Sequence, residues 1–159
     1  MTRVLFVCTG NVCRSPMAEV LLRREAAARG LDDVTVSSAG TSAWDGAPAS
    51  EGAYLVALEH ELDLSAHRAR LVTRDLLREA DLVLTMSRQH RARIQELAPD
   101  TRVQLLGEFA GRTGADAEVA DPFGGDLDTY RLTFGELEEL VRVAAGRLSG
   151  ERDAPGSRD

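Results

Sequence analysis

The sequence has few of the cysteine and histidine residues that cross-link small proteins through disulfides or metal ions. Its 159 residues include only two cysteines, Cys8 and Cys13, which are too few for a disulfide framework. No further cysteine or histidine stands near them, so the sequence indicates no zinc or other metal site. A chain of this length suits one domain that is stabilised by its own apolar core.

Long apolar runs and an excess of basic residues are also missing. No stretch approaches the roughly 18 uncharged apolar residues of a membrane span, and the N-terminus runs straight into a strand-like segment rather than a signal peptide. We therefore expect a cytoplasmic protein with no membrane partner. The net charge of −7 disfavours nucleic acid as a partner, because the phosphate backbone repels an acidic chain.

Two nucleotide-binding signatures are absent as well. The chain has no Gly-x4-Gly-Lys-Ser/Thr loop, and no Gly-x-Gly-x-x-Gly motif follows the first predicted strand. These absences exclude a P-loop and a dinucleotide site, and we expect no cofactor.

Strand-like and helix-like segments alternate along the chain. Short apolar runs predict four strands, at Arg3–Cys8, Val34–Ser38, Asp81–Met86 and Arg102–Leu106. Capped, periodic segments predict helices, at 15–30, 48–62, 73–80, 87–97 and 130–148. This alternation is typical of an α/β fold, and we expect a single doubly wound domain. Its four-stranded parallel sheet would have the flavodoxin-like order 2-1-3-4, with helices on both faces.

The predicted domain covers residues 1–148. Residues 149–159 are polar and hold glycine and proline, so we expect a disordered C-terminal tail. The segment 111–128 has little regular pattern, and long patternless loops in compact domains are often functional.

The end of the first predicted strand holds the candidate site. In a doubly wound sheet, ligands bind at the carboxyl ends of the strands where the winding reverses, and Cys8 stands there. The loop from Cys8 to Arg14 leads into a helix N-terminus, whose N–H groups and dipole attract an anion. Gly10 and Asn11 tolerate the left-handed backbone angles that curl such a loop. Arg14 presents a planar fork that can hold two phosphate oxygens.

A thiol at the mouth of this anion site predicts covalent phosphate chemistry. The same positive field stabilises the thiolate of Cys8, which is placed for in-line attack on a bound phosphoryl group. A phosphocysteine intermediate would divide the reaction into two easier steps. The alternative is a buried Cys8 that acts as a small hydrophobe, with Arg14 solvated at the start of the helix.

Such a reaction also needs an acid for the leaving oxygen and then a base for water. Asp121 is the candidate, because Asp121-Pro122-Phe123 stands in the patternless loop. Pro122 restricts the backbone of the residue before it and so fixes the direction of Asp121. Asp126 and Asp128 are competing candidates for the acid.

The segment Val7-Cys8-Thr9-Gly10-Asn11-Val12-Cys13-Arg14-Ser15-Pro16 resembles the signature of the low-molecular-weight protein tyrosine phosphatases. The resemblance extends to Ser38-Ala39-Gly40-Thr41, to His67-Arg68-Ala69-Arg70 and to Asp121-Pro122-Phe123, and it covers about residues 3–148. It implies a cysteine-dependent phosphomonoester hydrolase, with Cys8 as nucleophile, Arg14 as phosphate clamp and Asp121 as general acid.

The resemblance also implies roles for the other residues of the phosphate-binding loop. Ser15 would donate a hydrogen bond to the Cys8 thiolate. Cys13 would form a reversible disulfide with Cys8 and protect it from overoxidation. The loop residues besides Cys8 and Arg14 are Thr9, Gly10, Asn11, Val12, Cys13 and Ser15.

Residues outside the loop would support and wall it by the same resemblance. Asn11 would join Ser38 and His67 in a buried network that holds the loop curled. Trp44 and Phe123 would wall the mouth of the cleft.

Two cues on the substrate point in opposite directions. The apolar, branched Val12 resembles the isoleucine of tyrosine-specific members, and it favours packing on the aromatic ring of phosphotyrosine. Asp-Pro-Phe-Gly-Gly at residues 121–125, with Thr9 and the motif at 135–140, resembles the protein-arginine phosphatase branch. We give Val12 more weight because it lies inside the loop, so phosphotyrosine on a protein is the expected substrate and phosphate the product. The alternatives are phosphoarginine, arsenate reduction and a silent phosphate-binding module.

The sequence also leads to expectations for two histidines and a tyrosine outside these motifs. His60 and His90 are expected at the surface of helices. Tyr130 follows the acid loop, and three possibilities stay open: a phosphorylation site, a cleft residue or a residue that starts the last helix.

Overall fold

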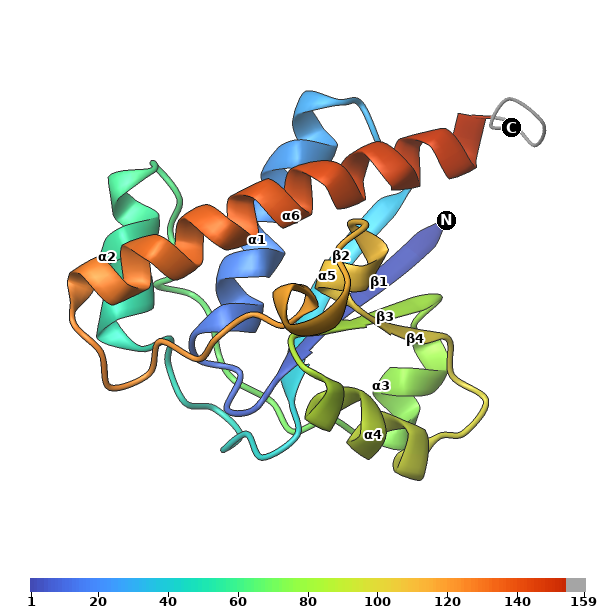
Figure 1. Ribbon diagram of the computed structural model, residues 1–159, viewed down its shortest axis with the longest axis horizontal. Coiled ribbons are helices and arrows are strands. Elements are labelled where there is room, and N and C mark those ends of the chain that lie inside the picture. The colour runs from blue at the N-terminus through green and yellow to red at the C-terminus, as the bar shows by residue number, and fades with distance from the viewer. Residues whose placement is uncertain (154–159) are drawn as a thin grey trace.

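A four-stranded parallel sheet forms the centre of the computed structural model, which describes residues 1–153 (Figure 1). The strands are β1 (Thr2–Cys8), β2 (Val34–Gly40), β3 (Leu82–Thr85) and β4 (Val103–Leu105). Their order in the sheet is β2-β1-β3-β4. The predicted fold class and strand order are therefore confirmed.

Helices cover both faces of this sheet. On one face lie α1 (Arg14–Ala28), α2 (Glu51–Glu59), α5 (Leu106–Phe109) and α6 (Leu127–Asp153). The other face carries α3 (Arg74–Glu79) and α4 (Arg88–Leu97), and a short 3₁₀ turn, η1 (Gly114–Ala117), precedes the loop that holds Asp121. In Figure 1 the long helix α6 runs across α1 and α2, while α3 and α4 lie on the opposite side of the strands.

The alternation of side chains along β1 divides the core into two layers. Val4, Phe6 and Cys8 belong to the larger apolar cluster under α1 and α6. Leu5 and Val7 belong to the smaller cluster under α3 and α4. Successive side chains of a strand point to opposite faces of its sheet, so a central strand must be apolar throughout. This is why the segment before Cys8 does not alternate between apolar and polar residues. Because β1 is an inner strand, Cys8 lies between the ends of β2 and β3.

Helix α6 extends further than the sequence predicts. It begins at Leu127 rather than Tyr130 and continues to Asp153 rather than ending at Leu148. The apolar stripe ends at Leu148, but adding residues to an existing helix costs little once the nucleus has formed. The first part of the predicted tail is thus helical, and residues 154–159 lie outside the residues that the structure describes.

Residues 1–153 include no helix that combines the length and the apolar character needed to cross a membrane. The same residues contain no cluster of acidic, cysteine or histidine side chains able to hold a metal ion.

Candidate active site

The loop after β1 turns its carbonyl groups outward. The backbone oxygens of Cys8 and Thr9 accept from the N–H groups of Thr41 and Ser42, each at 2.9 Å. Further along the loop, the Val12 oxygen accepts from the Ser50 N–H at 2.9 Å. In a planar trans peptide the C=O and the following N–H point in opposite directions. Outward carbonyls therefore leave the N–H groups of the loop directed toward its centre, where they form an anion site.

Asn11 supplies the bend that curls the loop. Its φ is 57°, a left-handed conformation that asparagine tolerates better than most residues. Its backbone oxygen accepts from Nε2 of His67 at 2.7 Å. Its side-chain Nδ2 donates to Ser15 Oγ at 2.8 Å and to Ser38 Oγ at 2.9 Å, and Oδ1 accepts from the Arg70 N–H at 3.0 Å. The structure thus brings together Asn11, Ser38 and His67, the three residues that the family resemblance links in one network.

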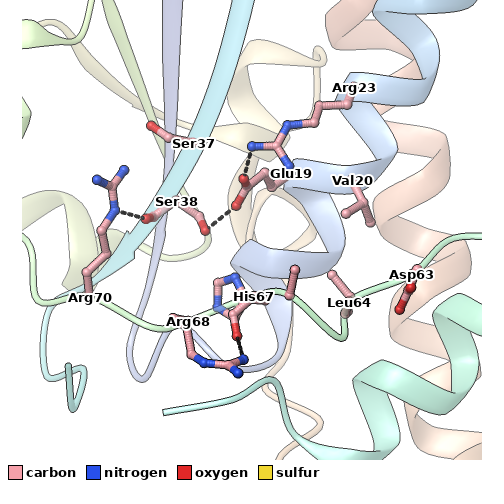
Figure 2. Close-up of a pocket in the computed structure, with 11 residues that line it drawn as sticks. Glu19, Val20, Arg23, Ser37, Ser38, Asp63, Leu64, His67, Arg68 and Arg70 are labelled. Carbon is pink, nitrogen blue, oxygen red and sulfur yellow. Dashed lines mark hydrogen bonds and ion pairs between the residues drawn. The ribbon is translucent and has the colours of Figure 1, made fainter. Parts of the chain in front are cut away.

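Further polar contacts hold Ser38 in place. Figure 2 shows these contacts in the cavity that Ser38 helps to line. Ser38 Oγ donates to Glu19 Oε1 at 2.6 Å, and Glu19 also pairs with Arg23 on the next turn of α1. From the other side, Arg70 Nε donates to the Ser38 backbone oxygen at 3.0 Å. Glu19 is not predictable as a site residue from the sequence, because a Glu and an Arg four residues apart are typical of an exposed helical ion pair.

The thiol of Cys8 is buried and contacts the Ser15 hydroxyl, with 2.9 Å between Sγ and Oγ. Asn11 Nδ2 donates to that same Ser15 oxygen, so the hydroxyl proton of Ser15 is free to point at Cys8. Ser15 can therefore donate a hydrogen bond to the Cys8 sulfur, which lies close to the N-terminus of α1. Ser15 lies inside the first turn of α1 and does not cap the helix, because α1 begins at Arg14 and its N-cap residue is Cys13.

Arg14 lies beside the thiol with most of its guanidinium already oriented. Nη1 donates to the Val119 backbone oxygen at 2.9 Å, and Nη2 lies 3.4 Å from Thr9 Oγ1 and 3.5 Å from Asp121 Oδ2. Its Nε is buried and has no hydrogen-bond partner among residues 1–153. Buried donors are nearly always paired, so an unpaired N–H at an anion site is a feature that an oxyanion ligand explains.

Asp121 approaches the same point from the loop before α6. Its side chain is 49% exposed and pairs with Arg14, and its Oδ1 accepts from the Phe123 N–H at 3.1 Å. The competing carboxylates have other partners at the start of α6. Asp126 accepts from the N–H and the hydroxyl of Thr129, each at 2.9 Å, and these bonds lower its pKa. Asp128 pairs with Arg131 at 2.7 Å.

One cavity of about 220 Å³ gathers most of the predicted site. Its lining residues are Cys8, Thr9, Gly10, Val12, Cys13, Arg14, Asp121 and Phe123. Phe123 is 66% exposed at its rim. Trp44 is 85% exposed and does not line this cavity, so its role as a cleft wall stays a prediction.

Cys13 and Tyr130 contact each other behind the loop. Cys13 Sγ lies 3.2 Å from Ser50 Oγ and 3.4 Å from the Tyr130 hydroxyl. Burial raises the pKa of the Cys13 thiol and raises that of Tyr130 to about 12. Tyr130 is itself buried and lies outside the lining of the cavity. Of its three possibilities, this burial favours a structural residue near the start of α6.

His90 is not the surface residue that the sequence predicts. It is only 3% exposed, with Nε2 2.8 Å from Thr9 Oγ1 and Nδ1 3.0 Å from Ser87 Oγ. The expectation was wrong because α4 is mostly polar, and the close approach of α4 to the loop after β1 is not visible in its sequence. His60, in contrast, is exposed at the end of α2, as predicted.

The environment of His90 keeps its imidazole neutral. Burial and the positive charge of Arg14 lower its pKa to about 4, and the carboxylates of Asp121 and Glu118 oppose this shift. No sequence pattern marks this residue as part of the site, apart from its being a histidine.

A comparison with known families agrees with this geometry. The model of the family described as low molecular weight phosphotyrosine protein phosphatase matches residues 3–154. The chain belongs to this family. Its members are hydrolases with a catalytic cysteine, so the predicted family and enzyme class are confirmed.

Relatives from two branches of the phosphatase family are similar over nearly their whole length. The protein-arginine-phosphatase of Bacillus subtilis strain 168 is 42% identical over 151 residues, which cover 94% of this chain and 98% of the relative. The low molecular weight protein-tyrosine-phosphatase Wzb of Escherichia coli strain K12 is 38% identical over 149 residues, covering 94% and 97%. Among solved structures, a mutant of the YwlE arginine phosphatase with a phosphorylated active-site serine matches with a TM-score of 0.89 and 40% identity, covering 95% of this chain and 98% of that one.

Proposed function

We propose that this protein hydrolyses phosphotyrosine on protein substrates through a phosphocysteine on Cys8. The observation that carries the proposal is the meeting of Cys8, Arg14 and Asp121 in one cavity at the N-terminus of α1. A silent phosphate-binding module would need neither a thiol that accepts a hydrogen bond nor a carboxylate beside the clamp.

In the first step, the Cys8 sulfur forms a bond to phosphorus while the bond to the leaving oxygen breaks. The loop N–H groups and Arg14 stabilise the charge on the equatorial oxygens, and the Asp121 carboxyl gives its proton to the leaving oxygen. In the second step Asp121 takes a proton from water, which attacks phosphorus and releases Cys8 and phosphate. Ser15 stabilises the sulfur as a leaving group through its hydrogen bond.

The apolar lining supports an aromatic substrate. Val12 and Phe123 line the cavity that holds the thiol, and apolar contacts of this kind suit the flat ring of phosphotyrosine. Phosphoarginine is the second candidate, because the Bacillus subtilis relative that is 42% identical to this chain is a protein-arginine-phosphatase. Both candidates use the same nucleophile, clamp and acid.

The test is phosphate release from a phosphotyrosine peptide and a phosphoarginine peptide of the same sequence, with Cys8→Ser as the blank. Preference for phosphotyrosine would support the assignment from Val12. Preference for phosphoarginine would replace phosphotyrosine as the substrate, and a Cys8→Ser variant that kept substantial activity would refute the mechanism.

We also propose a cytoplasmic location, supported by two free cysteines, since thiols persist in reducing compartments.

A further inference from the structure

The proposed mechanism gives no role to His90, a buried titratable side chain near the site. His90 lies on α4, on the opposite side of the sheet from α1, the helix that follows the phosphate-binding loop. Both of its ring nitrogens have partners, Thr9 Oγ1 at 2.8 Å and Ser87 Oγ at 3.0 Å. Ser87 is the N-cap of α4 and its oxygen also accepts from the His90 backbone N–H at 3.4 Å. The imidazole is thus held at both ends.

These contacts continue as far as the phosphate clamp. Arg14 Nη2 donates to Thr9 Oγ1 at 3.4 Å, so a chain of hydrogen bonds runs from Arg14 through Thr9 and His90 to Ser87. The same Nη2 atom lies 3.5 Å from Asp121 Oδ2. Thr9 and Asp121 therefore compete for one edge of the guanidinium.

Donor and acceptor chemistry gives the chain a direction. A guanidinium can only donate, so the Thr9 oxygen accepts from Arg14 and its own proton is available for His90 Nε2. Nε2 is then an acceptor, and the ring proton is on Nδ1, where it donates to Ser87 Oγ. The other tautomer would place two donors on the Thr9 oxygen and leave the Thr9 proton without a use in the chain.

We propose that His90 is a positioning residue, which fixes the Thr9 hydroxyl and through it holds Arg14 in place to clamp the phosphoryl group. The inference rests on the proposed function, because it assigns Arg14 to the phosphate. Thr9 is exposed, so without the imidazole its hydroxyl would turn to water. Arg14 would then relax toward Asp121, which would weaken the clamp and engage the acid at the same time.

The experiment compares His90→Leu, which fills the volume without hydrogen bonds, with His90→Gln, which can bridge the same partners. We expect His90→Leu to lower kcat/KM for para-nitrophenyl phosphate about fivefold and to weaken binding of inorganic phosphate, measured by calorimetry, by a similar factor, as for the loss of one hydrogen bond. His90→Gln should recover most of both. His60→Leu, at the C-cap of α2, is the control for replacing a histidine elsewhere, and thermal unfolding checks that each variant is folded.

A double-mutant cycle tests whether the effect passes through Thr9. We expect Thr9→Val with His90→Leu to be no worse than Thr9→Val alone, because the chain is already broken. Additive losses, or equal losses in the Leu and Gln variants, would overturn the proposal and leave His90 as core filler.

A spectroscopic readout keeps the proposal separate from the proposed function. Nitrogen NMR of the unmodified protein should show the His90 ring protonated on Nδ1, and Thr9→Val should shift its Nε2 signal. Protonation on Nε2 would overturn the proposed direction. If the wild-type protein released no phosphate from either peptide, the proposed function would fail, while phosphate binding and the NMR signals would still decide the role of His90.

Discussion

Replacing Asn11 by alanine should destabilise the protein severely and disable the site. Asn11 is fully buried, and its side chain makes three hydrogen bonds, to Ser15, Ser38 and the Arg70 N–H. Each buried bond contributes about 1 kcal/mol. The φ of 57° adds a further cost for alanine of about 1–2 kcal/mol. We therefore expect the free energy of unfolding to fall by about 4 kcal/mol.

The assay is urea unfolding of the wild type, Asn11→Ala and Asn11→Gly. Glycine loses the same hydrogen bonds but adopts the left-handed backbone without a steric cost, so it should be more stable than alanine by about 1 kcal/mol. In both variants kcat/KM should fall more than phosphate binding, because Ser15 is no longer oriented toward Cys8. A loss below about 1 kcal/mol for Asn11→Ala, or equal stability of the two variants, would refute the reasoning.

Three other changes have outcomes that the geometry determines. Gly40→Ala should prevent the phosphate-binding loop from closing, because the added Cβ would lie 2.5 Å from the Thr9 backbone oxygen. We expect lower activity and a lower melting temperature, and a variant that matched the wild type in both would contradict this. Asp121→Ala should slow aryl phosphates with poor leaving groups more than those with good ones, and equal losses would remove Asp121 from the acid role. His90 binds its proton only near pH 4 when folded but near 6.5 when unfolded. The neutral ring therefore contributes stability above pH 6.5 that is lost as the pH falls to 4, by up to about 3 kcal/mol. In urea unfolding, His90→Gln should flatten this dependence, and an unchanged pH profile would show that His90 is not its source.

Local sequence determined the framework of the site. An apolar strand, a loop with Gly10 and Asn11, and a helix after the loop are all encoded within residues 2–28, so periodicity and backbone preferences were enough to predict them. The predicted helix began at residue 15 rather than at Arg14. The spacing of Cys8 and Arg14 placed thiol and guanidinium on one loop. The choice of Asp121 as the candidate acid also came from the sequence, since Pro122 and the absence of regular pattern marked its loop.

Only the tertiary structure decided how distant segments complete that site. Glu19 and Arg23 have the spacing of an ordinary exposed ion pair, but the packing of α1 against β2 makes Glu19 the partner of Ser38. His90 lies in a polar helix, and it is buried because β1 and β3 are adjacent in the sheet and bring α4 up to Thr9. Contacts between residues far apart in the chain leave no trace in local periodicity, since they depend on which strands pair and on which face each helix packs.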